Sequence, residues 1–167
     1  MIFVTVGTHE QPFNRLMKEI EYLIEDGVIK EKVVVQGGYS TYVPRKTDYH
    51  SFLDYHEMDD TIKNARIVIT HGGPASFIDV IQKGKIPIVV PRQSKYHEHI
   101  NDHQLKFVKF ISNRLNNIIP VYNISDLKRV IIDFDKISKS KNTNSRSNND
   151  RFNLKLERIV NDVLNIN

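Results

Sequence analysis

Short apolar runs alternate with amphipathic stretches along most of the chain. The runs are rich in valine, isoleucine and aromatic residues and end at glycine, proline or polar residues, which is typical of buried strands. We expect strands at 2–6, 32–38, 66–70, 86–90 and 118–122, and a shorter strand at 51–56. The polar stretch 39–50 contains Pro44 and is expected to form a loop.

Between these runs, apolar residues recur every three or four positions, the spacing of amphipathic helices. The clearest series is Phe13, Leu16, Ile20 and Leu23, and Pro12 before it suits the first turn of a helix. Further helices are expected at 57–65, 74–83, about 98–111 and from Ser125, as the N-cap, through 134.

This alternation predicts an α/β fold, because strands too apolar to face water on either side form a parallel sheet covered by helices on both faces. We expect a Rossmann-like, doubly wound sheet of about six strands over 1–137. Ligands of such sheets bind beyond the carboxyl ends of the strands. The residues expected there are Gly7, Thr8 and His9; Gln36, Gly37 and Gly38; His71, Gly72 and Gly73; and Pro91, Arg92 and Gln93.

The last part of the chain differs from the rest. Residues 138–150 have almost nothing to bury and are expected to form a flexible linker. Residues 151–167 place Phe152, Leu156, Ile159 and Val163 on one helical stripe. We expect this amphipathic helix to fold back on the domain or to dock on another subunit.

Composition excludes several chemistries. The 167 residues include no cysteine, so disulfides, thiolate metal sites and a cysteine nucleophile are ruled out. The net charge of +4 is mildly basic and leaves polyanion binding as a distant alternative to a solvated tail. The N-terminus has no secretory signal pattern, and no apolar run approaches the roughly 20 residues of a spanning helix, so we expect a cytoplasmic protein that reaches the membrane through a partner.

The sequence HGGPAS follows one buried run and opens a helix. Gly72 and Gly73 would leave room for a ligand atom, and the free N–H groups at a helix start suit a phosphate. Ser76 could add a hydroxyl donor, and Asp79 could accept hydrogen bonds from a ribose diol. A plain glycine-rich turn with Ser76 as a cap remains the alternative. The G-x-G-x-x-G and G-x-x-x-x-G-K-[ST] phosphate motifs are absent.

Histidines gather in SKYHEHINDHQ, at His97, His99 and His103. The H-E-x-x-H pattern is absent, and we predict no metal site; a cluster that contacts sugar hydroxyls or a solvated helix start is favoured. His9 could act as an acid or base, or it could be an ordinary hydrogen-bonding loop residue.

The residues TVGTH, QGG, THGGPASFIDVIQKGKIPIVVPR and DHQ resemble the C-terminal, nucleotide-sugar-binding half of family 28 glycosyltransferases of the GT-B fold. The similarity spans about 2–111. It is closer to stand-alone versions of this half, namely bacterial PssE-type polysaccharide subunits and the catalytic subunit of the dolichol-linked chitobiose synthase.

The resemblance implies a UDP-sugar as donor substrate and no cofactor. Gly72, Gly73, Ala75 and Ser76 would hold the diphosphate, with Asp79 where the family often has a glutamate that contacts ribose. His103 and Gln104 fall on the donor-sugar contact, and Gln93 lies nearby. The asparagine that the family usually has after this pair is absent, since Phe107 or Val108 occupies the region.

Because a GT-B enzyme has two Rossmann-like halves, the resemblance also implies a partner. That partner would be a membrane-anchored, acceptor-binding subunit. The resulting hypothesis is an inverting hexosyltransferase that acts on a lipid-linked saccharide in capsule or exopolysaccharide synthesis, with His9 as a weak candidate for the base. The alternatives are a regulatory subunit that binds a nucleotide-sugar without catalysis and a sugar-nucleotide epimerase.

Overall fold

A computed structural model describes residues 1–142 of the chain. Its centre is a parallel sheet of six strands in the order β3-β2-β1-β4-β5-β6. The strands are β1 (Ile2–Thr5), β2 (Val33–Gln36), β3 (Asp48–His50), β4 (Ile67–His71), β5 (Ile88–Val90) and β6 (Ile119–Pro120). The predicted Rossmann-like, doubly wound fold is therefore confirmed.

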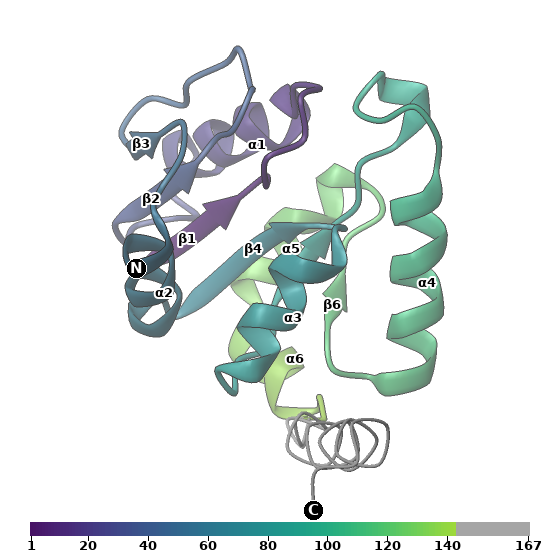
Figure 1. The fold of residues 1–167 in the computed structure, drawn as a ribbon. Helices are drawn as coiled ribbons and strands as arrows, with labels where there is room; N and C mark the ends of the chain where they lie inside the picture. The colour runs from purple at the N-terminus through teal and green to yellow at the C-terminus, as the bar shows by residue number, and fades with distance from the viewer. Residues whose placement is uncertain (143–167) are drawn as a thin grey trace, which may run out of the picture.

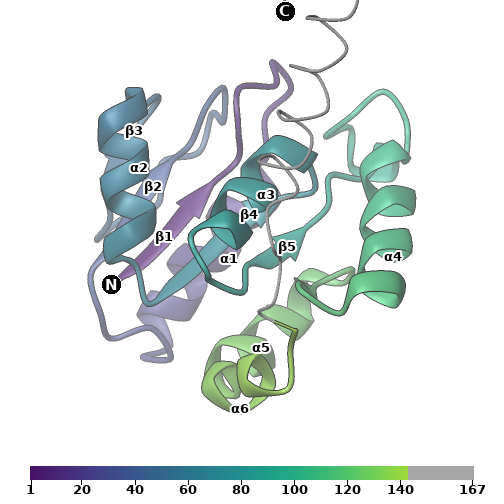
Figure 2. The same cartoon turned by 60° about the horizontal axis from the view of Figure 1, so that its bottom comes forward.

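Helices cover both faces of this sheet, with α2 and α3 in front of the strands and α1 behind them in Figure 1. Figure 2 shows α2, α3 and α4 spread across one face. The helices are α1 (Asn14–Glu25), α2 (Tyr55–Asn64), α3 (Pro74–Gln82), α4 (His103–Leu115), α5 (Leu127–Ile132) and α6 (Phe134–Lys139), with short 3₁₀ turns η1 (Ser94–Tyr96) and η2 (Ile124–Asp126).

The alternation of side chains along each strand divides the core into two layers. Ile2 and Val4 of β1 pack with α1, α5 and α6 in one apolar cluster, whereas Phe3 packs with α2 and α3 on the opposite face. A third cluster, around Val89 and Val108, lies under α3 and α4. The central strands are buried on both sides, which explains their continuous apolar runs.

The expected strand at 51–56 is wrong. The strand lies a few residues earlier, at β3, where Asp48–His50 pair with residues 34–36 of β2 inside the stretch expected to be a loop. The carboxylate of Asp54 instead accepts the Glu57 N–H at 2.8 Å, and the Glu57 carboxylate accepts the Asp54 N–H at 2.9 Å. This reciprocal capping box starts α2 and removes Asp54 and its neighbours from the sheet.

The helix expected at 98–111 is also displaced, because α4 begins only at His103. The side chain of Asp102 is committed to the preceding turn, where it accepts the Ser94 N–H at 2.8 Å. The Asn101 side chain accepts the His103 N–H at 3.0 Å, just before the N-cap residue Asp102. His97 adopts a left-handed conformation (φ 56°), which ends η1 and separates it from α4.

Smaller differences concern helix starts. Ser125 is not an N-cap: it lies within η2, and Asn123 accepts its N–H at 3.4 Å. The helix expected to run through 134 is divided at Asp133 into α5 and α6. Pro12 lies before α1, whose N-cap is Phe13.

Helix α6 ends at Lys139, inside the range expected to be a linker. The remainder of that range beyond 142 and the expected helix at 151–167 lie outside the described residues. No helix within residues 1–142 has the length and apolar character needed to cross a membrane.

Candidate functional site

The loops that follow β1, β4 and β5 meet at the carboxyl edge of the sheet around the side chain of His71. A Cβ atom added at Gly7 would lie 2.1 Å from its Nε2, and one added at Gly73 would lie 2.2 Å from its Cε1. Only glycine therefore fits on either side of the ring. The space that the sequence assigned to a ligand at Gly73 is occupied by the protein's own imidazole, which is a correction to that argument.

The His71 side chain is neutral. Burial, helped by the nearby Arg92 guanidinium and by His9 and His99, lowers its pKa to about 3. Nδ1 accepts the Gly73 N–H at 3.0 Å, which places the imidazole proton on Nε2. The ring thus fixes the turn into α3 and retains one N–H donor for a ligand at the rim.

Helix α3 begins at this turn with unpaired donors. Gly73 is the N-cap, no side chain caps the helix, and Pro74 occupies the first position. The N–H groups of the first turn, at Ala75 and Ser76, have no acceptor within the helix. Ala75 is exposed and Ser76 partly exposed. The helix start, its positive dipole end and the Ser76 hydroxyl form a cradle suited to an anion.

Gln104 holds the cradle together from α4. Its Oε1 accepts the N–H of Gly72 at 3.1 Å and the N–H of Arg92 at 3.2 Å, which joins the loops after β4 and β5. The oxygen is thereby used inside the protein, and the amide Nε2 is the group left for a ligand. Its neighbour His103 is exposed and stacks on Phe107, with ring centroids 6.4 Å apart.

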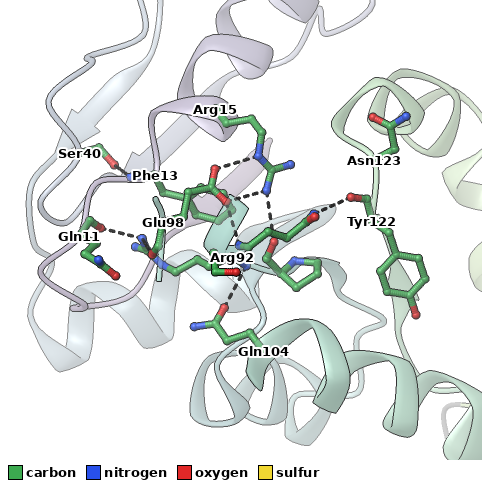
Figure 3. A network of polar contacts seen from close by, with 12 residues as sticks. Gln11, Phe13, Arg15, Ser40, Arg92, Glu98, Gln104, Tyr122 and Asn123 are labelled. Atoms are coloured by element: carbon green, nitrogen blue, oxygen red, sulfur yellow. Dashed lines mark hydrogen bonds and ion pairs between the residues drawn. The ribbon is translucent and has the colours of Figure 1, made fainter. Parts of the chain in front are cut away.

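The sequence placed Arg92 at this edge of the sheet but assigned it no role, and the structure shows what it does. It is fully buried (0 % exposed) and lies over the Phe13 ring at 4.8 Å. Its guanidinium donates to the carbonyls of Gln11 (2.6 Å), Val6 (3.0 Å) and Glu98 (3.2 Å). Arg92 therefore joins the loop after β1 to the loop after β5 (Figure 3). Burial lowers its pKa to about 10, so it stays charged at neutral pH.

Glu98 provides the anion beside this buried cation. Its carboxylate pairs with Arg15 through two contacts, at 2.8 and 2.9 Å, and accepts the Gln93 N–H at 3.1 Å. The Gln93 side chain is itself committed, because its amide donates to the Tyr122 carbonyl at 2.7 Å. The predicted substrate contact Gln93 thus lies in this support network, with its amide nitrogen already engaged. Figure 3 shows the network around Arg15, Arg92 and Glu98.

The candidate base His9 lies beside the predicted cradle. Its ring stacks on His99 with centroids 4.6 Å apart, and its Nε2 bonds Gln11 Oε1 at 3.0 Å. Burial and the neighbouring His9 and Arg92 charges lower the pKa of His99. Within residues 1–142, no group of three or more histidine and acidic side chains has the arrangement of a metal site.

The other predicted residues divide between the rim and the scaffold. Thr8 is exposed. Gln36 donates to Thr5 Oγ1 at 3.1 Å and accepts the Leu53 N–H at 3.1 Å, so both ends of its buried amide serve the fold. Gly37 makes room for the Tyr49 ring, since a Cβ there would lie 2.2 Å from the phenol oxygen. Asp79 lies one turn below Ser76 on α3 and pairs with Lys83.

The family model described as the glycosyltransferase family 28 C-terminal domain matches residues 1–161. The chain belongs to this family. The expected resemblance is confirmed by two curated relatives, both named UDP-N-acetylglucosamine transferase subunit ALG13. The human protein is 33% identical over 119 residues and the mouse protein 32% identical over 114. These matches cover 65% and 64% of this chain. The chain spans only about a tenth of the length of either relative.

Solved glycosyltransferases share the fold of this family 28 domain. They include the glycosyltransferase of kitacinnamycin (TM-score 0.56, 12% identity) and SnogD from Streptomyces nogalater (TM-score 0.52, 12% identity). MurG of Acinetobacter baumannii gives a TM-score of 0.51 at 14% identity. The matches cover 83%, 84% and 80% of this chain but 36%, 39% and 40% of the solved chains. The domain thus corresponds to one Rossmann-like half of a GT-B fold.

Proposed function

We propose that this chain is the UDP-sugar-binding, catalytic subunit of an inverting hexosyltransferase whose acceptor-binding half is a second protein. The observation that carries the proposal is the uncapped start of α3, which faces the rim beside the neutral His71. A nucleotide diphosphate matches these donors in charge and in geometry. Family membership and the name of both curated relatives, UDP-N-acetylglucosamine transferase subunit ALG13, support the same assignment.

In this proposal the diphosphate lies against Gly72, Gly73, Ala75 and Ser76. The ribose would lie one turn along α3 at Asp79, whose carboxylate would exchange its Lys83 contact for the two hydroxyls. The donor sugar would lie toward α4, where His103 and the free amide nitrogen of Gln104 are available. Thr8 and Gly7 form the rim opposite this sugar.

The chemistry follows from charge development on UDP. As the glycosidic bond breaks, the departing diphosphate gains negative charge, and the α3 N–H groups and the His71 Nε2–H become stronger partners for it than for the bound donor. No resident metal is part of this scheme. His9 is the candidate base on this chain, and its bond to Gln11 orients its ring.

A partner is part of the proposal because both curated relatives are named as subunits of a transferase. We propose a membrane-anchored partner that presents a lipid-linked saccharide in capsule or exopolysaccharide assembly, and a cytoplasmic location for this chain at the membrane. Deletion of 151–167 should abolish co-purification with that partner, and undiminished co-purification would exclude docking through this segment.

The decisive experiment is calorimetric titration of the full chain with UDP-N-acetylglucosamine, UDP-galactose and UDP-glucuronic acid in EDTA. Asp79→Ala should weaken binding about tenfold, since hydrogen bonds to the ribose are lost. Asp59→Ala is the matched control, because Asp59 also pairs with Lys83, at 3.1 Å, but projects from α2. If none of the three UDP-sugars binds even when the partner is present, the proposal is overturned. If binding requires a metal ion, the mechanism is overturned.

A further inference from the structure

A cavity of about 800 Å³ opens between α1 and the η1 turn, apart from the cradle at His71. Pro12, Asn14, Arg15, Lys18, Glu19 and Tyr22 line one wall, and residues 95–98 line the other. We call this space the α1–η1 groove. Among the residues named as candidate contacts in the sequence, His97 lies in its walls, as a member of the histidine cluster favoured to contact sugar hydroxyls.

The floor of the groove holds an unsatisfied donor. Arg15 gives Nε and Nη2 to Glu98, and Nη2 also donates to the Pro91 carbonyl at 3.2 Å. Its Nη1 is buried without a hydrogen-bond partner. The side chain is fixed in place between two aromatic rings, 5.3 Å from Phe13 and 4.7 Å from Tyr96. A fixed guanidinium that lines a cavity and keeps an unpartnered N–H is a suitable partner for an oxyanion.

Further cations border this donor. Lys18 lies over the Tyr42 ring at 5.6 Å, and Lys95 lies over the Tyr96 ring at 4.7 Å. Neither ammonium belongs to an ion pair among residues 1–142, although Lys95 helps to lower the pKa of the Asp102 carboxyl. The Glu98 carboxylate, which pairs with Arg15, neutralises only the Arg15 guanidinium. The two lysines outnumber the one other carboxyl in the lining, Glu19, and so favour an anionic ligand.

The remaining wall residues suit a polyhydroxylated group. Tyr22 and Tyr96 are 53% and 45% exposed and present aromatic faces against which the C–H face of a sugar ring can pack. Glu19 also lines the groove, and burial raises the pKa of its carboxyl. Such a carboxyl is a hydrogen-bond partner for hydroxyl groups.

The groove lies next to the place where a glycosyl group would be transferred. Glu98 forms its inner wall, and His99, the next residue, stacks on His9 beside His71. One short segment, 97–99, therefore separates the groove from the candidate base and the cradle.

We infer that the α1–η1 groove binds a phosphorylated saccharide, with a phosphate at Arg15, Lys18 and Lys95 and a sugar ring against Tyr96 and Tyr22. The inference rests on the proposed function, because it makes this groove the part of the acceptor site that this chain contributes. The ligand class is fixed by the chemistry of the walls. The phosphate can belong to a lipid-linked saccharide or to a free sugar phosphate.

The test uses the full chain saturated with UDP, so that the cradle is occupied. Two probes are titrated by calorimetry, and amide shifts are followed by NMR: glucose 1-phosphate and a short-chain polyprenyl diphosphate glucose. We expect shifts at Lys18, Tyr22 and Tyr96 with at least one probe. The variant Lys18→Ala/Lys95→Ala and the single variant Tyr96→Ala should each weaken that binding about tenfold and change UDP affinity less than about twofold. Lys139→Ala, an exposed position on α6, is the control.

The outcomes separate this inference from the proposed function. Binding of both probes supports a site for the sugar and one phosphate, and binding of the lipid-linked probe alone supports an acceptor site. If UDP binds but neither probe binds, or if the probes bind only when UDP is omitted, the groove is not this site and the proposed function stands. If UDP itself does not bind, the proposed function fails first.

Discussion

The fit of one imidazole between two glycines makes a sharp prediction for residues 71 and 73. Gly73 has ordinary dihedral angles (φ −74°, ψ 128°), so alanine is excluded there only by the His71 ring. Gly73→Ala should destabilise the protein by about 2 kcal/mol through overpacking. In the His71→Ala background the same change should cost little, because the ring is gone.

Urea unfolding of both single variants and the double variant measures this coupling, which we expect to be about 1–2 kcal/mol. Additive effects would show that the ring and Gly73 do not compete for the same space.

The buried His71 also predicts a pH dependence. Its pKa is about 3 in the folded protein and near 6.5 when unfolded, so below pH 6.5 the unfolded chain binds the extra proton. The neutral ring therefore favours folding above pH 6.5, and this advantage is lost progressively as the pH falls toward 3. Wild type should lose up to about 1.4 kcal/mol per pH unit more than His71→Gln in this window. Parallel stability curves from urea unfolding would contradict the assignment.

At this scale the sequence located the right junction but explained it incompletely. His71, Gly72 and Gly73 stand out because their residue types are rare between a strand and a helix. The sequence could not reveal that Gly73 accommodates His71, and Gly72 accommodates Gln104 and Pro91, rather than a ligand atom, since that depends on packing in the fold. The sequence placed Arg92 at the rim but could not predict its burial or its role, because an arginine is ordinarily exposed and its carbonyl partners come from loops far apart in the chain.

At the scale of elements, the capping box of α2 carries a prediction. Asp54→Ala removes the acceptor of the Glu57 N–H and should lower the free energy of unfolding by about 1 kcal/mol. Asp60→Ala, in the same helix and exposed, is the matched control and should change stability by less than about 0.5 kcal/mol. Equal losses in the two variants, measured by urea unfolding, would show that charge in α2 matters and the cap does not.

The elements that were predicted correctly share strong local signals. Strands β1, β4 and β5 are apolar runs, and α3 begins at a proline and is amphipathic. The displaced elements were decided by single polar side chains. Asp54 commits its segment to a helix, and Asp102 holds the turn before α4. Such side chains are compatible with several local structures, so only their partners in the fold select one.

At the scale of the whole molecule, the parallel order of the sheet places the functional residues on one edge. Four loops distant in sequence meet there because every strand points the same way. This convergence was predictable from the alternation of strands and helices. The relative positions of groove, histidine pair and cradle were not, because they depend on the path of the 92–102 segment across the rim.

The bond network of Arg92 determines that path and makes the last prediction. Its guanidinium holds the carbonyls of Val6, Gln11 and Glu98, residues contributed by the loops after β1 and β5. Arg92→Met keeps much of the apolar stem but leaves those carbonyls and the Glu98 region without their cation. We expect a loss of about 3 kcal/mol in the free energy of unfolding.

Hydrogen exchange distinguishes a local from a global role for this residue. If Arg92 joins the two loops, the backbone amides of 6–11 and 93–98 should lose protection from exchange together in Arg92→Met. The amides of β2 and α2 should lose only the protection that the lower global stability of the variant accounts for. Arg92→Lys should not restore the protection of these amides, because a single ammonium cannot reach all the carbonyls that a planar guanidinium contacts through separate nitrogens. Exchange that rises only in 93–98 would contradict a shared clamp. It would leave the loop after β1, and with it His9, positioned by contacts other than Arg92, such as the stack of His9 on His99.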